Sequence, residues 1–117
     1  MAEVTIYHNP GCSKSRGAIE IAEAQKVDFE VIEYLQKLPT KAELESIVSK
    51  LEDPISELVR KDKKFAELGL NEADYTTPET VISILLEHPV LMQRPIIIKG
   101  SKAIIARPSE RIHEIIG

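Results

Sequence analysis

One stretch of this chain combines a nucleophile with surroundings that could activate it. The residues are His8-Asn9-Pro10-Gly11-Cys12-Ser13-Lys14-Ser15-Arg16, between a short apolar run and a helical pattern. A thiol at the start of a helix meets unpaired backbone N–H groups and the positive end of the helix dipole. Both favour the thiolate, which is the nucleophilic form of cysteine. The stretch therefore predicts that Cys12 is a reactive residue.

Three polar neighbours in the same stretch could tune this thiol. His8 would add positive charge if it approached the sulfur, as would Arg16. Ser15 lies three residues after Cys12 and can donate a hydrogen bond to the sulfur across one helical turn. Gly11 lets the backbone turn and leaves space for a ligand.

The simpler interpretation of a free cysteine is a small buried hydrophobe. The neighbours of Cys12 argue against it, because they are Pro10, Gly11, Ser13 and Lys14. These residue types indicate a polar loop rather than a core. The sequence favours the reactive interpretation.

Three arginines could bind an anion near the thiol. Taken singly, each is more simply a solvated surface charge. However, Arg94 directly precedes Pro95 and Arg107 directly precedes Pro108, at the two outer ends of the final predicted hairpin. Strand pairing would bring these two guanidinium groups together, and an anion would relieve their repulsion. The planar fork of arginine suits an oxyanion, so Arg94 and Arg107 are predicted ligands; Arg60 is a third candidate.

Other residues have plainer interpretations. Tyr7, Tyr34 and Tyr75 are interpreted as structural, and His88 as a helix C-terminal residue. No Cys/His spacing suggests a zinc site, and no glycine-rich phosphate loop is present. Pro95 could be an ordinary edge residue or could follow a cis bond, which about 5–6% of X-Pro bonds adopt, so the sequence alone does not decide.

The elements that position these residues begin with a βαβ unit. Val4 to Tyr7 and Phe29 to Tyr34 are predicted strands, separated by a helix over residues 13 to 25. A crossover helix between two such strands predicts that they are parallel.

A helical segment and then a ββα unit follow. Thr40 and Glu43 predict a capping box, and Thr77 with Pro78 predicts another helix start, with the helix ending near His88. Two short strands, over 95–98 and 103–106, then form a hairpin before a last helix near Pro108. The order predicts an α/β, thioredoxin-like, mixed four-stranded sheet (βαβ plus ββα) in one domain, 1–117, with a helical insertion over about residues 40–88.

Composition excludes several classes of protein. The chain has 117 residues, a net charge of -4, and no basic run of the kind that neutralises nucleic-acid phosphates. No apolar stretch approaches the roughly 20 residues that span a bilayer. Met1-Ala2-Glu3-Val4 does not resemble a signal peptide, and the one cysteine excludes an internal disulfide. We therefore expect a cytoplasmic protein with no nucleic-acid or membrane partner, and nothing demands more than a monomer.

The loop around Cys12 closely resembles the active-site loop of the glutaredoxin- and glutathione-dependent arsenate reductases. The resemblance continues in order along nearly the whole chain. It covers Leu35 to Thr40, Arg60, Glu67 to Leu70, His88-Pro89, Arg94-Pro95-Ile96 and Arg107-Pro108-Ser109-Glu110.

This resemblance implies specific roles. Cys12 would be the nucleophile that attacks arsenate, Arg60, Arg94 and Arg107 would bind the oxyanion, and His8 and Ser15 would tune the thiol. It also implies that Pro95 matches the cis-proline of the fold. Glutathione would act as co-substrate and glutaredoxin as partner, with no bound cofactor or metal. With no second cysteine in the chain, an external thiol must resolve the Cys12 adduct.

Rival functions remain within the same fold. A redox regulator that binds RNA polymerase typically carries a Cys-x-x-Cys switch, but here the fourth position is Ser15. A monothiol glutaredoxin that holds an iron–sulfur cluster has a Cys-Gly-Phe-Ser loop, unlike Cys12-Ser13-Lys14-Ser15. A binding module with an inert Cys12 is a third possibility.

Overall fold

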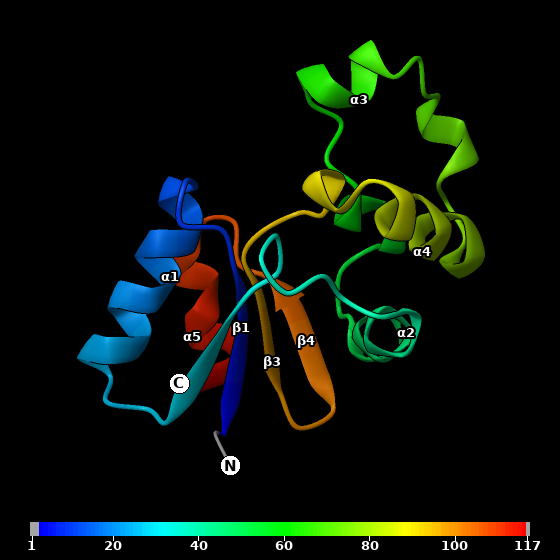
Figure 1. The fold of residues 1–117 in the computed structure, drawn as a ribbon. Helices are drawn as coiled ribbons and strands as arrows, with labels where there is room; N and C mark the ends of the chain where they lie inside the picture. The colour runs from blue at the N-terminus through cyan, green and yellow to red at the C-terminus, as the bar shows by residue number, and fades with distance from the viewer. Residues whose placement is uncertain (1–2, 117) are drawn as a thin grey trace.

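A mixed four-stranded sheet forms the centre of the protein (Figure 1). The computed structural model describes residues 3–116. The strands are β1 (Val4–His8), β2 (Phe29–Glu33), β3 (Ile96–Lys99) and β4 (Lys102–Ile105), in the order β2-β1-β3-β4. β1 is parallel to β2 and antiparallel to β3, which pairs antiparallel with β4. This confirms the predicted α/β arrangement; residues 1, 2 and 117 of the predicted domain lie outside the described part of the chain.

Helices lie on both sides of this sheet. The α-helices are α1 (Ser13–Ala24), α2 (Lys41–Lys50), α3 (Lys63–Glu67), α4 (Pro78–Glu87) and α5 (His113–Ile116). Single 3₁₀ turns are η1 (Ile55–Leu58), η2 (Glu72–Asp74), η3 (Pro89–Leu91) and η4 (Ser109–Ile112). Everything from α2 to α4 falls within the predicted helical insertion between β2 and β3.

The predicted helix starts are present. Thr40 caps α2 in a capping box with Glu43, whose backbone N–H donates to the Thr40 hydroxyl over 3.1 Å. Thr77 caps α4, and Pro78 occupies its first turn. His88 is the C-cap of α4, as its position in the sequence indicated.

Two apolar cores form because side chains alternate along the strands. Ile96 and Ile105 face the core beneath α2 and α4, whereas Ile97 and Ile104 face the core beneath α1 and α5. Figure 1 shows α1 and α5 on one side of the sheet and α2 and α4 on the other. The sheet is therefore covered on both faces, and its carboxyl-end loops are left to form a site.

Close packing holds α1 against the segment after β4. Gly17 is needed there, because a Cβ atom at this position would lie 2.6 Å from the Ser109 hydroxyl. That hydroxyl donates to the Lys14 carbonyl over 2.7 Å. The contact fixes the start of α1 relative to the end of β4, which are the elements that carry Cys12 and Arg107.

Within residues 3–116, we find no helix that combines the length and apolar character required to cross a membrane.

Candidate active site

Cys12 stands where β1 leads into α1. It is the N-cap residue of that helix, with extended backbone angles (φ -105°, ψ 121°), and is half-buried. The preceding loop is closed by two hydrogen bonds to Asn9. The Cys12 N–H donates to the Asn9 carbonyl over 3.0 Å, and the Gly11 N–H donates to Asn9 Oδ1 over 2.9 Å. The sulfur thus lies beside the unpaired N–H groups at the start of α1.

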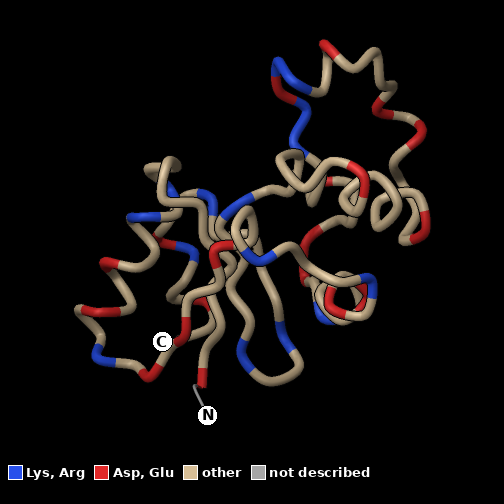
Figure 2. The backbone as a smooth tube through the Cα atoms, viewed as in Figure 1, with Lys and Arg blue, Asp and Glu red and all other residues tan. Residues whose placement is uncertain are grey.

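Arg94 and Arg107 meet beside this sulfur, as the hairpin pairing predicted. Arg107 Nη1 lies 3.7 Å from Cys12 Sγ and donates to the Arg94 carbonyl over 2.9 Å. Figure 2 shows basic positions gathered where the chain enters β3 and leaves β4, next to the start of α1. The peptide bonds before Pro95 and Pro108 are both cis. The first was implied by the family resemblance, and the second had no signal in the sequence.

The end of β4 is held by an ion pair that the sequence analysis did not single out. Asp53 Oδ2 accepts the Ile105 N–H over 2.9 Å, and Asp53 Oδ1 pairs with Arg111 Nη2 at 2.9 Å. Arg111 Nη1 donates to the Ile105 carbonyl over 2.9 Å. These contacts pair the N–H and carbonyl groups of Ile105 at the open edge of the sheet. Ile105 is two residues before Arg107, so they also fix the direction in which the chain leaves β4.

Arg94 has a donor that is still available. Its Nη1 donates to the Tyr34 hydroxyl over 3.4 Å and to the Val90 carbonyl over 3.3 Å. Its Nε is buried and has no hydrogen-bond partner in the described part of the chain. Leaving a charged donor buried and unpaired is costly, so this position favours an anion.

Arg60 reaches the same region through a short antiparallel contact. Val59 pairs with Met92, and the Arg60 N–H donates to the Leu91 carbonyl over 2.7 Å. The side chain itself pairs with Asp62, with 3.3 Å between Arg60 Nε and Asp62 Oδ2. Its positive charge acts to lower the pKa of the Tyr34 hydroxyl, which contacts Arg94. Arg60 therefore lies at the margin of the site, with part of its charge offset by a carboxylate.

The surroundings of Cys12 lower the pKa of its thiol to about 7. Burial by itself raises the pKa, because it disfavours the charged form. Hydrogen bonds to the sulfur lower the pKa and together exceed the effect of burial. The largest comes from the backbone N–H of Ser15, followed by the side chains of Arg94 and Arg107 and the backbone N–H of Lys14. A substantial fraction of Cys12 is then thiolate at neutral pH.

The structure corrects the predicted means by which His8 and Ser15 tune the thiol. Burial lowers the pKa of His8, with the Arg16 charge acting in the same direction and Glu33 opposing it. The lowered pKa disfavours the charged form of His8, so burial weakens the positive charge that the sequence suggested it could add. Its Nδ1 lies 2.6 Å from the Ser15 hydroxyl, which also accepts the Asn9 N–H over 3.0 Å.

The Ser15 hydroxyl is thus committed to the loop rather than to the sulfur. Ser15 acts on Cys12 through its backbone N–H instead. The Arg16 side chain also holds the loop, since its Nη1 donates to the Pro10 carbonyl over 2.7 Å. Sequence spacing identified the right neighbours but could not show which of their atoms face the sulfur.

Tyr34 was interpreted from the sequence as structural, and this was incomplete. Its side chain is fully buried, yet its hydroxyl contacts Arg94 and donates to the Met92 carbonyl over 3.3 Å. The side chain of Asn9, from the Cys12 loop, also lies beside this hydroxyl and acts to lower its pKa. The only sequence signal was its position directly after the second strand, at the edge of the sheet where the site forms.

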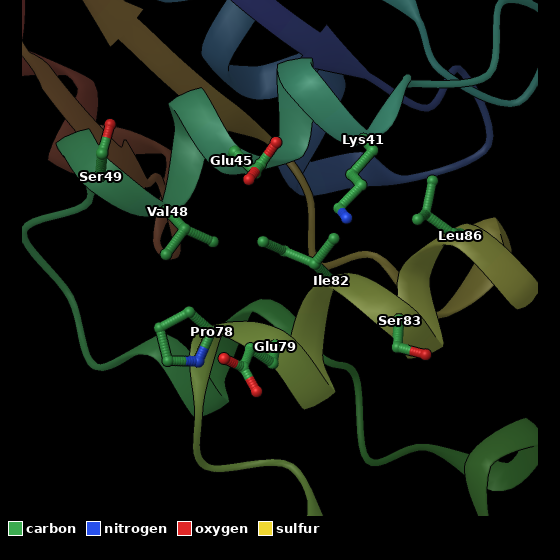
Figure 3. Close-up of a pocket in the computed structure, with 9 residues that line it drawn as sticks. All are labelled: Lys41, Glu45, Val48, Ser49, Pro78, Glu79, Ile82, Ser83 and Leu86. Atoms are coloured by element: carbon green, nitrogen blue, oxygen red, sulfur yellow. The ribbon is translucent and has the colours of Figure 1, made fainter.

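A separate groove lies between α2 and α4 (Figure 3). It is lined by Val48, Ile82 and Leu86 with scattered polar residues, and none of the arginines above contributes to it. Within residues 3–116, no group of three or more His, Cys, Asp or Glu side chains could hold a metal ion. The chemistry-bearing residues instead gather around Cys12.

Comparison with known proteins agrees with this geometry. The model of the ArsC family matches residues 7–115, which include the Cys12 loop and all three arginines. The chain belongs to the ArsC family. An arsenate reductase of Escherichia coli K12 is 36% identical over 117 residues, which span 99% of this chain and 82% of the relative.

Other ArsC relatives match over similar lengths. An arsenate reductase of Neisseria meningitidis serogroup A is 36% identical over 118 residues, covering 99% of this chain and 100% of the relative. The solved structure of an arsenate reductase from Vibrio cholerae superposes with a TM-score of 0.84 at 34% identity, covering 97% of this chain and 98% of the other. These matches confirm the family and the fold that the sequence predicted.

In this ArsC protein, the rate at which Cys12 reacts with iodoacetamide should depend on pH around neutrality. The thiolate reacts and the thiol does not, so the rate should rise with pH and reach half its maximum near pH 7. Below that midpoint, the rate should fall about tenfold per pH unit. Glutathione alkylated in parallel provides the reference thiol, and a Cys12 midpoint equal to that reference would contradict an activated Cys12.

Proposed function

We propose that this protein is an arsenate reductase that uses glutathione and glutaredoxin as its external thiols. Cys12 is the nucleophile, and Arg94, Arg107 and Arg60 bind the oxyanion. His8 and Ser15 set the conformation of the loop that presents the thiol. The names of the relatives support arsenate as the substrate.

One observation carries the proposal most directly: a half-buried, activated thiol lies beside the side chains of Arg107 and Arg94. Arg107 Nη1 is 3.7 Å from the Cys12 sulfur, and the buried Arg94 Nε has no hydrogen-bond partner among residues 3–116. An arsenate bound there would bring its arsenic to the thiolate while the arginines offset the charge of its oxygens. Donors fixed in place before the reaction stabilise the charge that develops in it.

The proposed chemistry begins with a sulfur–arsenic bond. The Cys12 thiolate attacks the arsenic atom of arsenate, and one oxygen leaves as hydroxide or water. The glutathione thiol then forms a second sulfur–arsenic bond, and a second oxygen leaves as water. The glutaredoxin thiol attacks the glutathione sulfur to form a mixed disulfide, and the electron pair of the broken sulfur–arsenic bond stays on arsenic. Water then displaces the Cys12 sulfur and releases arsenite. Over the full cycle, As(V) gains two electrons to become arsenite, and two external thiols lose two electrons and become one disulfide.

The single cysteine of the chain makes this dependence on outside thiols necessary. An ArsC protein with several cysteines could form its own disulfide, whereas this chain contains only Cys12. The proposal therefore includes a reducing compartment, the cytoplasm, where glutathione stays reduced. It includes no bound cofactor and no nucleic-acid or membrane partner, and the protein acts as a monomer.

A coupled assay tests the proposal. The purified protein is mixed with arsenate, glutathione, glutaredoxin, glutathione reductase and NADPH, and the oxidation of NADPH is followed. We expect oxidation only when all components are present, with arsenite as the product. Full activity with a thioredoxin system in place of glutathione and glutaredoxin would reject these donors while leaving arsenate reduction intact.

The same assay addresses the alternative of a redox regulator or binding protein without reductase activity. For that alternative, arsenate would cause no oxidation above the rate without protein. The absence of arsenite with both thiol systems would therefore overturn the proposed activity.

A further inference from the structure

The Tyr34 hydroxyl lies where three parts of the site converge. Tyr34 directly follows β2, which pairs with β1 on the side away from β3. Its oxygen accepts from Arg94 Nη1 over 3.4 Å and also lies beside the Asn9 side chain. Its own proton goes to the Met92 carbonyl over 3.3 Å. One buried group thus links the strand end, the Cys12 loop and the segment that carries Arg94.

The link to Arg94 determines which edge of the guanidinium group stays available. Nη1 is held by the Tyr34 hydroxyl and the Val90 carbonyl. Nε is buried and has no partner within the described residues, so the side of the planar group that contains Nε is the one left for a ligand. A guanidinium group held along one side presents the other as a fixed fork for an oxyanion, with little rotational freedom left to lose on binding.

The link to Asn9 acts on the thiol loop. The Asn9 side-chain oxygen accepts the Gly11 N–H over 2.9 Å, which leaves its NH₂ group to face the Tyr34 hydroxyl. The Asn9 carbonyl accepts the Cys12 N–H over 3.0 Å. Asn9 therefore connects the Tyr34 hydroxyl to the backbone that presents the sulfur.

Tyr34 itself is not placed to react. Its side chain is fully buried, and its only proton is already donated to Met92. Burial raises the pKa of its hydroxyl, although the nearby Arg94 charge opposes this, so it remains a neutral donor and acceptor at neutral pH. It can hold other groups in place, but it has no proton to give to a substrate.

We propose that Tyr34 is a positioning residue for oxyanion binding, which holds the Arg94 guanidinium and the Cys12 loop in register through its hydroxyl. This inference rests on the proposed function only for the identity of the oxyanion. The role itself concerns Arg94 and Cys12, whose relation can be measured without turnover.

The test is Tyr34→Phe, which removes the hydroxyl and keeps the ring. The matched control is Tyr7→Phe, because Tyr7 is also buried in the same core, but its hydroxyl donates to Glu43, 3.4 Å away and outside the site. In the reductase assay, Tyr34→Phe should raise the KM for arsenate about tenfold, with a smaller fall in kcat, as expected when one hydrogen bond to a charged group is lost. Tyr7→Phe should behave as wild type.

A second readout is independent of arsenate reduction. The pH midpoint of Cys12 alkylation should rise in Tyr34→Phe, because an unheld Arg94 spends less time beside the sulfur. It should rise in Arg94→Ala as well, and adding Tyr34→Phe to Arg94→Ala should then produce less than the sum of the two shifts. Thermal unfolding of each variant shows whether it is folded under the assay conditions.

The outcomes separate the two proposals. If wild type fails to reduce arsenate but the midpoint shifts are coupled, the proposed function fails and the role of Tyr34 stands. If wild type reduces arsenate and Tyr34→Phe matches Tyr7→Phe in KM and midpoint, the role of Tyr34 is overturned and the function stands. Additive shifts in the double variant also overturn it.

Discussion

Replacing Cys12 with serine should abolish arsenate-dependent turnover, with a loss on the order of 10⁴-fold or more. The sulfur lies beside the start of α1 and 3.7 Å from Arg107 Nη1, an arrangement that favours a negative charge at this atom. A serine hydroxyl stays protonated at neutral pH and is a far weaker nucleophile. With no other cysteine in the chain, no second thiol could take over the attack.

The loss should come from chemistry rather than from unfolding. Cys12 is only half-buried, and a hydroxyl at an N-cap position is usually favourable for a helix. Cys12→Ser should therefore unfold at about the wild-type temperature, measured by circular dichroism. Ser13→Ala, a change at the exposed neighbouring position, is the matched control and should retain activity. Retention of more than a small fraction of the wild-type rate in Cys12→Ser would reject Cys12 as the nucleophile.

Most of the fold could be predicted because its signals are local. The capping box at Thr40 and the proline after Thr77 each depend on a few adjacent residues, and both helices begin where predicted. The parallel pairing of β1 and β2 follows from the crossover between them. The strand boundaries were predicted less closely. β4 starts at Lys102 rather than at residue 103, so the turn before it is shorter than predicted.

The site could be predicted only in part, because a sequence shows which residues meet more readily than which atoms do. Arg94 and Arg107 were found because they flank one hairpin. The lowered pKa of His8 could not be predicted, because it depends on burial and on the charges of Glu33 and Arg16 in the folded chain. The role of Tyr34 was missed for the same reason: its hydroxyl contacts Arg94, which is 60 residues away along the chain.

Replacing Arg107 with alanine should lower kcat/KM for arsenate by about 10²- to 10³-fold, the usual effect of removing one donor from an oxyanion site. The loss has two sources. Arg107 Nη1 is a donor beside the Cys12 sulfur, and it also donates to the Arg94 carbonyl over 2.9 Å. Removing it also removes a positive group that lowers the pKa of the thiol, so the pH midpoint of Cys12 alkylation should rise above about 7.

Two further variants separate charge from geometry. Arg107→Lys keeps the positive charge but loses the planar fork, so its kcat/KM should fall between those of wild type and Arg107→Ala. Lys102→Ala removes the same charge from the exposed opposite end of β4 and should leave both kcat/KM and the alkylation midpoint unchanged. If Arg107→Ala and Lys102→Ala had equal effects, net charge alone would explain the loss. A change in kcat/KM of about twofold or less is too small to represent a lost charged contact. If Arg107→Ala showed only such a change, Arg107 would have no part in binding the oxyanion.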